Sequence, residues 1–253
     1  MKMTFKNFRD MGGLVCKDGS CIKYGKIFRT PKLVPKNQAD RNYLKSLNLD
    51  VVIDFRTEEE AKEAPDRLPA GVEYIHVPVF SIDMFPYLAV TWQATRATIH
   101  LKGNEISKLK ESKFESYRIM PFSHNAYAAL FKQMDEGKTL AFHCTQGKDR
   151  TGIAAMFIET AFMRDEKEIR KEFLKSNDAR KKENKLIEIF LRLTGKDKKL
   201  IEDITYCESV HEELLGTAYE TILQKYDSIS AFLKQEYGVT QERIEKWKKF
   251  YLE

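Results

Sequence analysis

The sequence predicts an α/β protein that carries additional helices. One observation is a short apolar run over residues 139–142, followed at once by a glycine-containing loop and then by an apolar helix pattern. A strand, a tight loop and a helix in this order point backbone N–H groups and a helix N-terminus at an anion. The other observations are alternating strand and helix patterns before residue 139 and an almost entirely helical pattern after Asp165.

Each expected element has a local signal. Glycines between short β-prone pieces predict a hairpin over 12–29, ahead of the main sheet. Asn37 can cap a helix that ends near Leu47, and Pro65 ends a brief helix that begins at Glu58. Apolar runs predict buried strands over 50–55 and 139–142, and an alternating pattern predicts a second strand over 72–80. Helical spacing predicts helices over 122–137 and 153–162.

Residues 81–121 show no clear period, because prolines and a basic stretch interrupt the pattern, and we expect a mobile excursion there. Further along, amphipathic helices are expected over 165–175, 183–193, 208–235 and 240–251. These helices exceed what a minimal core of sheet and loop needs. We therefore expect a single domain over 1–253, in which about 164–235 form a helical cap or lid.

Composition is typical of a soluble globular protein. Hydrophobic residues make up 42% and charged residues 32% of the chain, which argues against a disordered or fibrous protein. The first ten residues contain no apolar run of signal-peptide length, and no stretch reaches the roughly 18 apolar residues of a membrane span. Four cysteines do not make a disulfide framework, so a reducing compartment is the simpler interpretation. We expect a cytoplasmic protein and leave secretion by another kind of signal open.

The net charge of +5 is modest, and the lysines are spread through the second half of the chain. This balance suits an anionic substrate. Nucleic acid is not an expected partner, because nucleic-acid binders usually show a concentrated basic stripe with aromatic residues between the charges. The run Arg180-Lys181-Lys182-Glu183 is interpreted as a solvated helix face without a function.

The loop over 143–152, His-Cys-Thr-Gln-Gly-Lys-Asp-Arg-Thr-Gly, holds the parts of a site that hydrolyses phosphate monoesters. That reaction requires a nucleophile, donors around the equatorial oxygens and an acid for the leaving oxygen. We expect Cys144 to be the nucleophile, because a helix N-terminus and nearby cations can lower a thiol pKa from about 8.5 until the thiolate dominates. His143 can hold this geometry through a hydrogen bond to the backbone.

Arg150 lies six positions after Cys144, where a curled loop returns its planar guanidinium to grip two phosphate oxygens. Gly147 allows a close approach of the backbone, and Lys148 adds positive charge. Thr151 can donate its hydroxyl to the sulfur as a phosphocysteine breaks down. The expected substrate-binding residues are Thr145, Gln146, Gly147, Lys148, Asp149 and Arg150.

This run of His-Cys, five residues, Arg and Thr resembles the signature of the protein tyrosine phosphatase superfamily. Three blocks are similar to the bacterial tyrosine and dual-specificity phosphatases that also dephosphorylate phosphoinositides. They are Gly-Lys-Asp-Arg-Thr-Gly at 147–152, Asn-Phe-Arg-Asp-Met-Gly-Gly at 7–13 and Asp-Phe-Arg-Thr at 54–57. The resemblance covers about residues 4–163 in separate blocks, and the later helices correspond to a lid only loosely.

The resemblance implies a protein tyrosine phosphatase-like fold, with a central mixed sheet flanked by helices. It implies a cysteine-dependent hydrolase that uses no metal and no cofactor. The implied substrate is phosphotyrosine in a protein or peptide, with phosphoserine, phosphothreonine and phosphoinositide headgroups as additional candidates. Phosphate would be both product and inhibitor.

The general acid is left open between two aspartates. No Trp-Pro-Asp sequence occurs, since neither Trp92 nor Trp247 is followed by Pro-Asp. Asp83 follows the strand that ends at Phe80, where dual-specificity relatives place their acid. Asp149 lies within the loop, as in the bacterial subgroup, and is ranked slightly ahead.

Residues outside the loop are expected to support it. Asp54 and Arg56, at the end of a core strand, are assigned to this supporting role. The block Asn7-Phe8-Arg9-Asp10 is interpreted as bracing the site, with a polar start of a strand before a glycine turn as the alternative.

Other functions were weighed against this interpretation. A nucleotide-binding Walker loop does not fit, because Gly147-Lys148 is followed by Asp149 instead of Ser or Thr. A zinc site at Cys207 and His211, or at Cys16 and Cys21, is a weaker interpretation than packing. Two functional alternatives remain open, namely a non-catalytic module that binds phosphorylated ligands and another cysteine-loop chemistry such as sulfur transfer or arsenate reduction.

Overall fold

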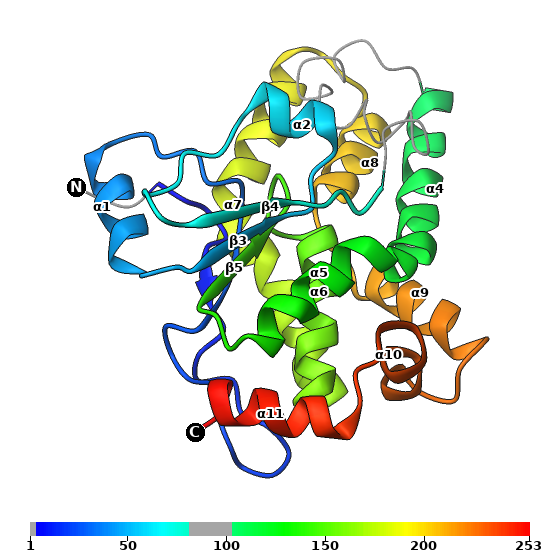
Figure 1. The fold of residues 1–253 in the computed structure, drawn as a ribbon. Helices are drawn as coiled ribbons and strands as arrows, with labels where there is room; N and C mark the ends of the chain where they lie inside the picture. The colour runs from blue at the N-terminus through cyan, green and yellow to red at the C-terminus, as the bar shows by residue number, and fades with distance from the viewer. Residues whose placement is uncertain (1–3, 81–102) are drawn as a thin grey trace.

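A computed structural model describes residues 4–80 and 103–253, and its centre is a mixed sheet in the order β1-β2-β5-β3-β4 (Figure 1). The strands are β1 (Arg9–Asp10), β2 (Ile27–Thr30), β3 (Val51–Asp54), β4 (Glu73–His76) and β5 (Leu140–His143). β1 pairs with β2 in the antiparallel sense, whereas β2, β5, β3 and β4 are parallel. The predicted α/β class and mixed sheet are confirmed.

The helices surround this sheet, and their ends follow from local capping. They are α1 (Gln38–Ser46), α2 (Glu58–Glu63), α4 (Gly103–Ile119), α5 (His124–Asp135), α6 (Asp149–Ala161), α7 (Glu166–Leu193), α8 (Lys198–Glu208), α9 (Glu212–Leu223), α10 (Ile229–Tyr237) and α11 (Gln241–Tyr251), with a short 3₁₀ turn, η3, at Met120–Phe122. The side chain of Asn37 accepts a hydrogen bond from the Asp40 N–H and starts α1, as predicted. Thr57 and Glu60 form a reciprocal capping box at the start of α2.

Both faces of the sheet are covered, which explains why β2, β3 and β5 are buried at every position. Successive side chains of a strand point to opposite faces. Val51 and Ile53 of β3 therefore join the main core with α5 and α6, while Val52 joins a smaller cluster with Leu44 of α1. Figure 1 shows α5 and α6 on one side of the sheet and α1 on the other.

The expectation of a mobile excursion over 81–121 is wrong for its second part. Residues 103–119 form α4, while 81–102 lie outside the described residues. The buried side chains of this helix include Lys113, Ser116 and Tyr117, so its inner face is largely polar. A polar inner face produces no apolar period, and the helix pattern was therefore not recognised.

Several other boundaries differ from the predictions. The two helices expected over 165–175 and 183–193 are one continuous helix, α7. Its middle turns are polar because they face the site, where Arg180 lies 3.8 Å from Glu208. The helix expected over 208–235 is two helices, α9 and α10, preceded by the unpredicted α8. The hairpin expected over 12–29 does not precede the main sheet but belongs to it. The second arm of this hairpin is β2, which pairs with β5.

The loop of interest lies at the carboxyl ends of the parallel strands. β5 ends at His143, which is paired in register with Thr30 of β2 and Asp54 of β3. α6 starts at Asp149 and returns beneath the sheet (Figure 1). Within residues 4–80 and 103–253, no helix is both long and apolar enough to cross a bilayer.

Candidate active site

The turn between β5 and α6 depends on a glycine. Gly147 has φ +67, a left-handed conformation that glycine adopts without strain. A Cβ at this position would lie 2.4 Å from the carbonyl oxygen of Thr30, which is closer than van der Waals contact allows. The loop can therefore curl against β2 only with glycine here, as the sequence predicted from the need for close backbone approach.

Asn7 and Arg29 hold the loop from behind. The Asn7 side-chain amide donates to the carbonyls of Gln146 at 3.0 Å and Gly147 at 2.8 Å. The buried Arg29 guanidinium donates to the same Gly147 carbonyl at 3.3 Å. These bonds fix the positions of two consecutive peptide groups in the middle of the loop. The contacts support the bracing interpretation of the block that begins at Asn7.

Asn7→Gly is expected to lower the free energy of unfolding by about 1–3 kcal/mol, because the Gln146 carbonyl loses the Asn7 donor and the buried Gly147 carbonyl keeps only the longer bond from Arg29. Asn7 has φ 64, so glycine keeps the backbone conformation and the change isolates the amide. Urea denaturation measures the effect. The matched control is Asn48→Gly, an exposed residue with φ 48, where a change within about 0.5 kcal/mol is expected. Equal effects at the two positions would refute the bracing role.

Cys144 lies at the base of the loop and is 2% exposed. Burial alone would raise the pKa of its thiol, but the Arg150 guanidinium and hydrogen bonding from Thr151 outweigh burial and hold that pKa below the ordinary value. The start of α6 faces the same position and also favours a negative charge. The lowered pKa favours the thiolate form of the sulfur, which is the form that acts as a nucleophile.

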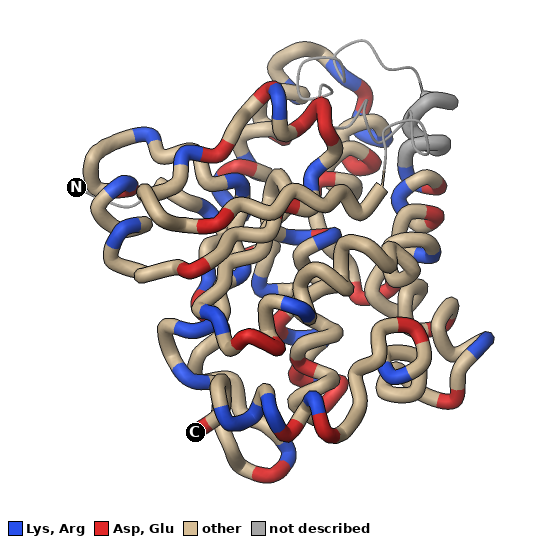
Figure 2. The backbone as a smooth tube through the Cα atoms, in the orientation of Figure 1, with Lys and Arg blue, Asp and Glu red and all other residues tan. Residues whose placement is uncertain are grey.

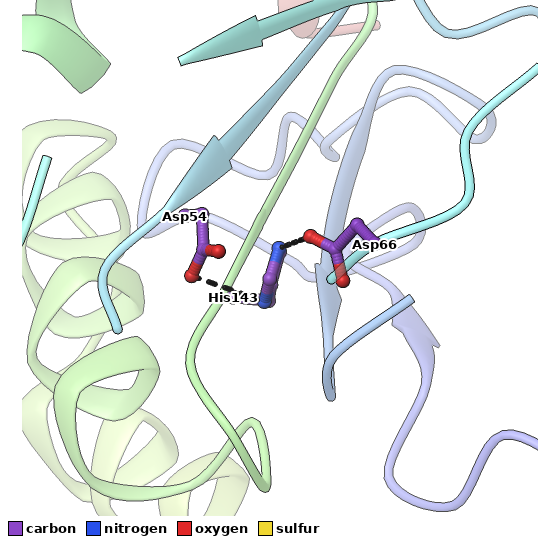
Figure 3. Close-up of side chains that lie close together, drawn as sticks. All are labelled: Asp54, Asp66 and His143. Atoms are coloured by element: carbon purple, nitrogen blue, oxygen red, sulfur yellow. Dashed lines mark ion pairs between the residues drawn. The ribbon is translucent and has the colours of Figure 1, made fainter. Parts of the chain in front are cut away.

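His143 is held in a buried charge cluster behind the nucleophile (Figure 3). Its Nε2 lies 2.8 Å from Asp66, and its Nδ1 lies 3.0 Å from the Cys144 carbonyl and 3.7 Å from Asp54. Burial lowers the pKa of His143, but the two carboxylates outweigh it and raise the pKa to about 9. The imidazole is thus charged at neutral pH and donates to the carbonyl beside the sulfur, the backbone bond that the sequence predicted.

Arg56 completes this cluster. Its Nε lies 2.9 Å from both oxygens of Asp54, and its terminal nitrogen lies 3.3 Å from Asp66. Asp54, Asp66 and His143 place ligand-type atoms within 4.8 Å of one another, a spacing that a metal ion could use. However, the guanidinium and the imidazolium already satisfy both carboxylates, so the chemistry fits a charge-paired support and not a metal centre. Sequence reasoning missed Asp66, which no motif marks.

Arg150 is held by a carboxylate that the sequence analysis did not identify. Its two terminal nitrogens lie 2.5 and 2.8 Å from the two oxygens of Glu60, and the Thr145 hydroxyl donates to the same carboxylate. Burial alone would raise the pKa of Glu60, but Arg150 and Thr145 lower it to about 2. Glu60 thus takes two of the five N–H donors of the guanidinium and fixes its orientation, while other donors remain for a phosphate. The spacing Thr57-x-x-Glu60 was the available signal, though it indicates only a helix cap.

Asp149 is surrounded by donors and cations. The Tyr117 hydroxyl donates to it at 2.7 Å, and the ammonium groups of Lys113 and Lys148 lie 3.6 and 3.7 Å away. Burial alone would raise the pKa of Asp149, but the two lysines, Tyr117 and Arg150 lower it to about 2. Asp149 is therefore ionised at neutral pH in the ligand-free protein. Asp83, the other acid candidate, lies outside the described residues.

Two lysines connect the loop to the end of α8. Lys148 donates to the Glu208 carbonyl at 2.6 Å, and Lys113 donates to the carbonyls of Cys207 and Ser209 at 2.5 and 2.6 Å. These carbonyls lie at the negative end of the helix dipole, where cations are stabilised. Lys148 was predicted to add charge to the loop, and the structure turns its ammonium group toward α8. Lys113 was missed because α4 was not predicted.

The zinc sites weighed from the sequence do not form. All four cysteines are free thiols, and the described residues place neither Cys16 with Cys21 nor Cys207 with His211 in a metal-type cluster. The His211 ring stacks on Tyr206 with 3.9 Å between centroids. Packing therefore accounts for these residues.

Comparisons with known proteins identify relatives of this chain. The profile of the tyrosine phosphatase family matches residues 3–253. A tyrosine-protein phosphatase of Cupriavidus necator is 30% identical over 175 residues, which cover 69% of this chain and 61% of that protein. The triple specificity protein phosphatase PtpB of Mycobacterium tuberculosis is 24% identical over 265 residues, covering 95% of this chain and 94% of that protein. The match thus spans less than two thirds of the Cupriavidus protein but nearly all of PtpB.

Solved structures include TpbA of Pseudomonas aeruginosa. It aligns over 79% of this chain and 89% of its own with 13% identity and a TM-score of 0.34. A TpbA variant in complex with pTyr aligns over the same shares with 11% identity and a TM-score of 0.33.

Proposed function

The chain belongs to the tyrosine phosphatase family of cysteine-dependent phosphomonoesterases, and on this basis we propose that it hydrolyses phosphate monoesters through a phosphocysteine at Cys144. The observation that carries the proposal is the single turn between β5 and α6, which depends on Gly147 and carries the buried Cys144 before it and Arg150 after it. Arg150 and Thr151 both lower the pKa of the Cys144 thiol against burial. A thiolate and a bidentate cation at one loop are what attack on a phosphate requires.

The proposed reaction has two steps. In the first, the Cys144 thiolate forms an S–P bond as the P–O ester bond breaks, and an acid protonates the departing oxygen. Arg150, oriented by Glu60, donates its remaining N–H groups to phosphate oxygens and stabilises their charge. In the second, water attacks phosphorus, the S–P bond breaks, and the thiolate and inorganic phosphate are released. Thr151 stabilises the leaving thiolate.

The proposed substrate is phosphotyrosine in a protein or peptide. The match to the tyrosine phosphatase family and the name of the PtpB relative, a triple specificity protein phosphatase, support this choice. The name of PtpB also favours a broad substrate specificity. Phosphoserine, phosphothreonine and phosphoinositides are therefore proposed as additional substrates. We further propose one phosphatase domain over the whole chain, a cap that includes α7 and α8, and a cytoplasmic location, where the thiolate stays reduced.

Hydrolysis of an aryl phosphate and a phosphotyrosine peptide, measured with a chelator and no added metal, tests the function. Turnover of both substrates is expected, with inhibition by phosphate. Sulfur transfer from thiosulfate, or arsenate reduction, faster than phosphate hydrolysis would instead assign another cysteine-loop chemistry. Tight binding of phosphotyrosine without turnover would assign a non-catalytic module.

Asp149→Asn is expected to lower kcat by about 10²–10³-fold for an alkyl phosphate, whose leaving oxygen needs a proton, and to remove the basic limb of the pH profile. A bound phosphate dianion is expected to raise the pKa of Asp149 from about 2, because nearby negative charge disfavours ionisation. For p-nitrophenyl phosphate, with its good leaving group, a much smaller loss is expected. Asp83→Asn is the paired variant, and an effect confined to it would identify Asp83 as the acid.

A further inference from the structure

The outer face of α7 carries an exposed apolar stripe. Leu186, Ile189, Phe190 and Leu193 are 66, 41, 46 and 82% exposed. Their spacing of three and four residues places them on one face of the helix. Single exposed apolar side chains are common, but four neighbours on one helix face indicate an interaction surface.

This stripe is not part of the packing between α7 and α8. The opposite side of α7 supplies Leu191 and Ile187, which pack with Leu200, Ile201 and Ile204 of α8. The helix pair is therefore already held together without the outer residues. Packing among residues 4–80 and 103–253 therefore leaves the stripe exposed.

The stripe lies within a basic segment of the chain. Residues 180–199 contain eight Lys or Arg and three Asp or Glu, a net charge of +5, which equals the net charge of all 253 residues. The other 233 residues are therefore neutral overall. Figure 2 marks the lysines and arginines along this part of α7 and the start of α8.

The stripe and the phosphate loop belong to one end of the molecule. Glu208 at the end of α8 accepts from Gln146 of the loop at 3.3 Å and lies 3.8 Å from Arg180 of α7. Figure 1 shows the ends of α7 and α8 at the same end as α2, whose Glu60 holds Arg150. The stripe begins six residues beyond Arg180, roughly 9 Å farther along α7, so it lies farther from the loop than these contacts do.

We propose that residues 186–193 of α7, with the surrounding lysines, bind the surface of an anionic lipid bilayer. An apolar helix face flanked by cations inserts its apolar side chains at the boundary of headgroups and acyl chains, while the cations meet the anionic headgroups. The stripe lies on a convex helix face, which suits a flat bilayer better than a peptide. A second copy of the chain would bring two segments of charge +5 together, which repulsion disfavours.

Cosedimentation with vesicles tests the proposal on the full chain. Binding is expected to mixed phosphatidylserine and phosphatidylcholine vesicles, to weaken as salt rises, and to be much weaker with phosphatidylcholine alone. Phe190→Ser with Leu193→Ser is expected to lower the vesicle affinity at least about tenfold. Lys181→Gln, Lys182→Gln and Lys199→Gln together are expected to lower it by roughly fivefold per lysine.

Leu223→Ser is the matched control, since Leu223 is 50% exposed at the end of α9 and lies outside the basic segment. It should bind vesicles like the wild type. These lipids are phosphodiesters, so binding is measured independently of the proposed phosphatase activity, and aryl phosphate turnover should be unchanged in the stripe variants. Absent vesicle binding, or full binding by the stripe variant, would overturn the proposal. A concentration-dependent dimer that the stripe variant abolishes would assign the stripe to a second copy instead.

Discussion

Cys144→Ser is expected to lower kcat for an aryl phosphate by roughly 10⁵-fold. The serine hydroxyl stays protonated at neutral pH, and Arg150 cannot lower its pKa far enough to supply an anionic nucleophile. Phosphate affinity should persist, because Arg150 and the loop N–H groups are unchanged. Steady-state turnover measures the first effect, and calorimetry with inorganic phosphate measures the second.

Cys21→Ser is the matched control for this prediction. Cys21 has a partly exposed free thiol, and its backbone forms an isolated β-bridge with Val15. It does not belong to the loop. Wild-type turnover is expected in this variant. If Cys144→Ser kept its turnover, another group would have to attack phosphorus, and the phosphocysteine mechanism would be wrong.

Arg150→Lys is expected to lower kcat/KM by roughly 10³-fold. An ammonium group cannot make two parallel hydrogen bonds to a phosphate, and it stabilises the transition-state charge less well. The same change leaves Glu60 with a poorer partner, so the protein should also lose stability. Removing the charge completely, as in Arg150→Met, should cost about 3–5 kcal/mol, because the Glu60 carboxylate remains buried.

The catalytic and structural effects can be separated with two further variants. Arg164→Lys changes a buried ion pair with Glu159, away from the loop, and should affect stability without a comparable loss of rate.

Glu60→Gln removes the carboxylate that binds the Arg150 guanidinium. The pKa of Glu60 is lowered from 4.5 to about 2, so its stabilising effect is complete above pH 4.5 and is lost as the pH falls toward 2. Glu60→Gln should lack this part of the acid dependence. An equal rate loss in Arg150→Lys and Arg164→Lys would contradict a catalytic role for Arg150.

The phosphate loop could be predicted because its determinants are local. The spacing of Cys144, Gly147 and Arg150 within one strand–loop–helix unit contains the nucleophile, the tight turn and the cation. Asp54 and Arg56 were also found, since they follow a recognisable buried strand. In each case, chemistry and position are encoded within a few residues of an element that the apolar pattern identifies.

The partners of the loop residues could not be predicted, because they come from distant elements. Glu60 reaches Arg150 from α2, and Tyr117 and Lys113 reach Asp149 from α4. Such contacts depend on how helices pack, which a single sequence does not specify. α4 was missed for a related reason. Its buried side chains include polar ones that form ion pairs and hydrogen bonds with other elements, and these do not produce an apolar pattern in the sequence.

Lys148 and Lys113 bind carbonyls at the end of α8, and this contact links ligand binding in the loop thermodynamically to the packing of α8. Lys148 cannot turn toward a ligand in the loop without giving up the carbonyl of Glu208. Any ligand that recruits Lys148 therefore loosens α8, and any agent that displaces α8 releases Lys148 by the same free energy, as reciprocity requires. Binding of such a ligand to the loop is therefore expected to increase amide hydrogen exchange at residues 198–208 of α8.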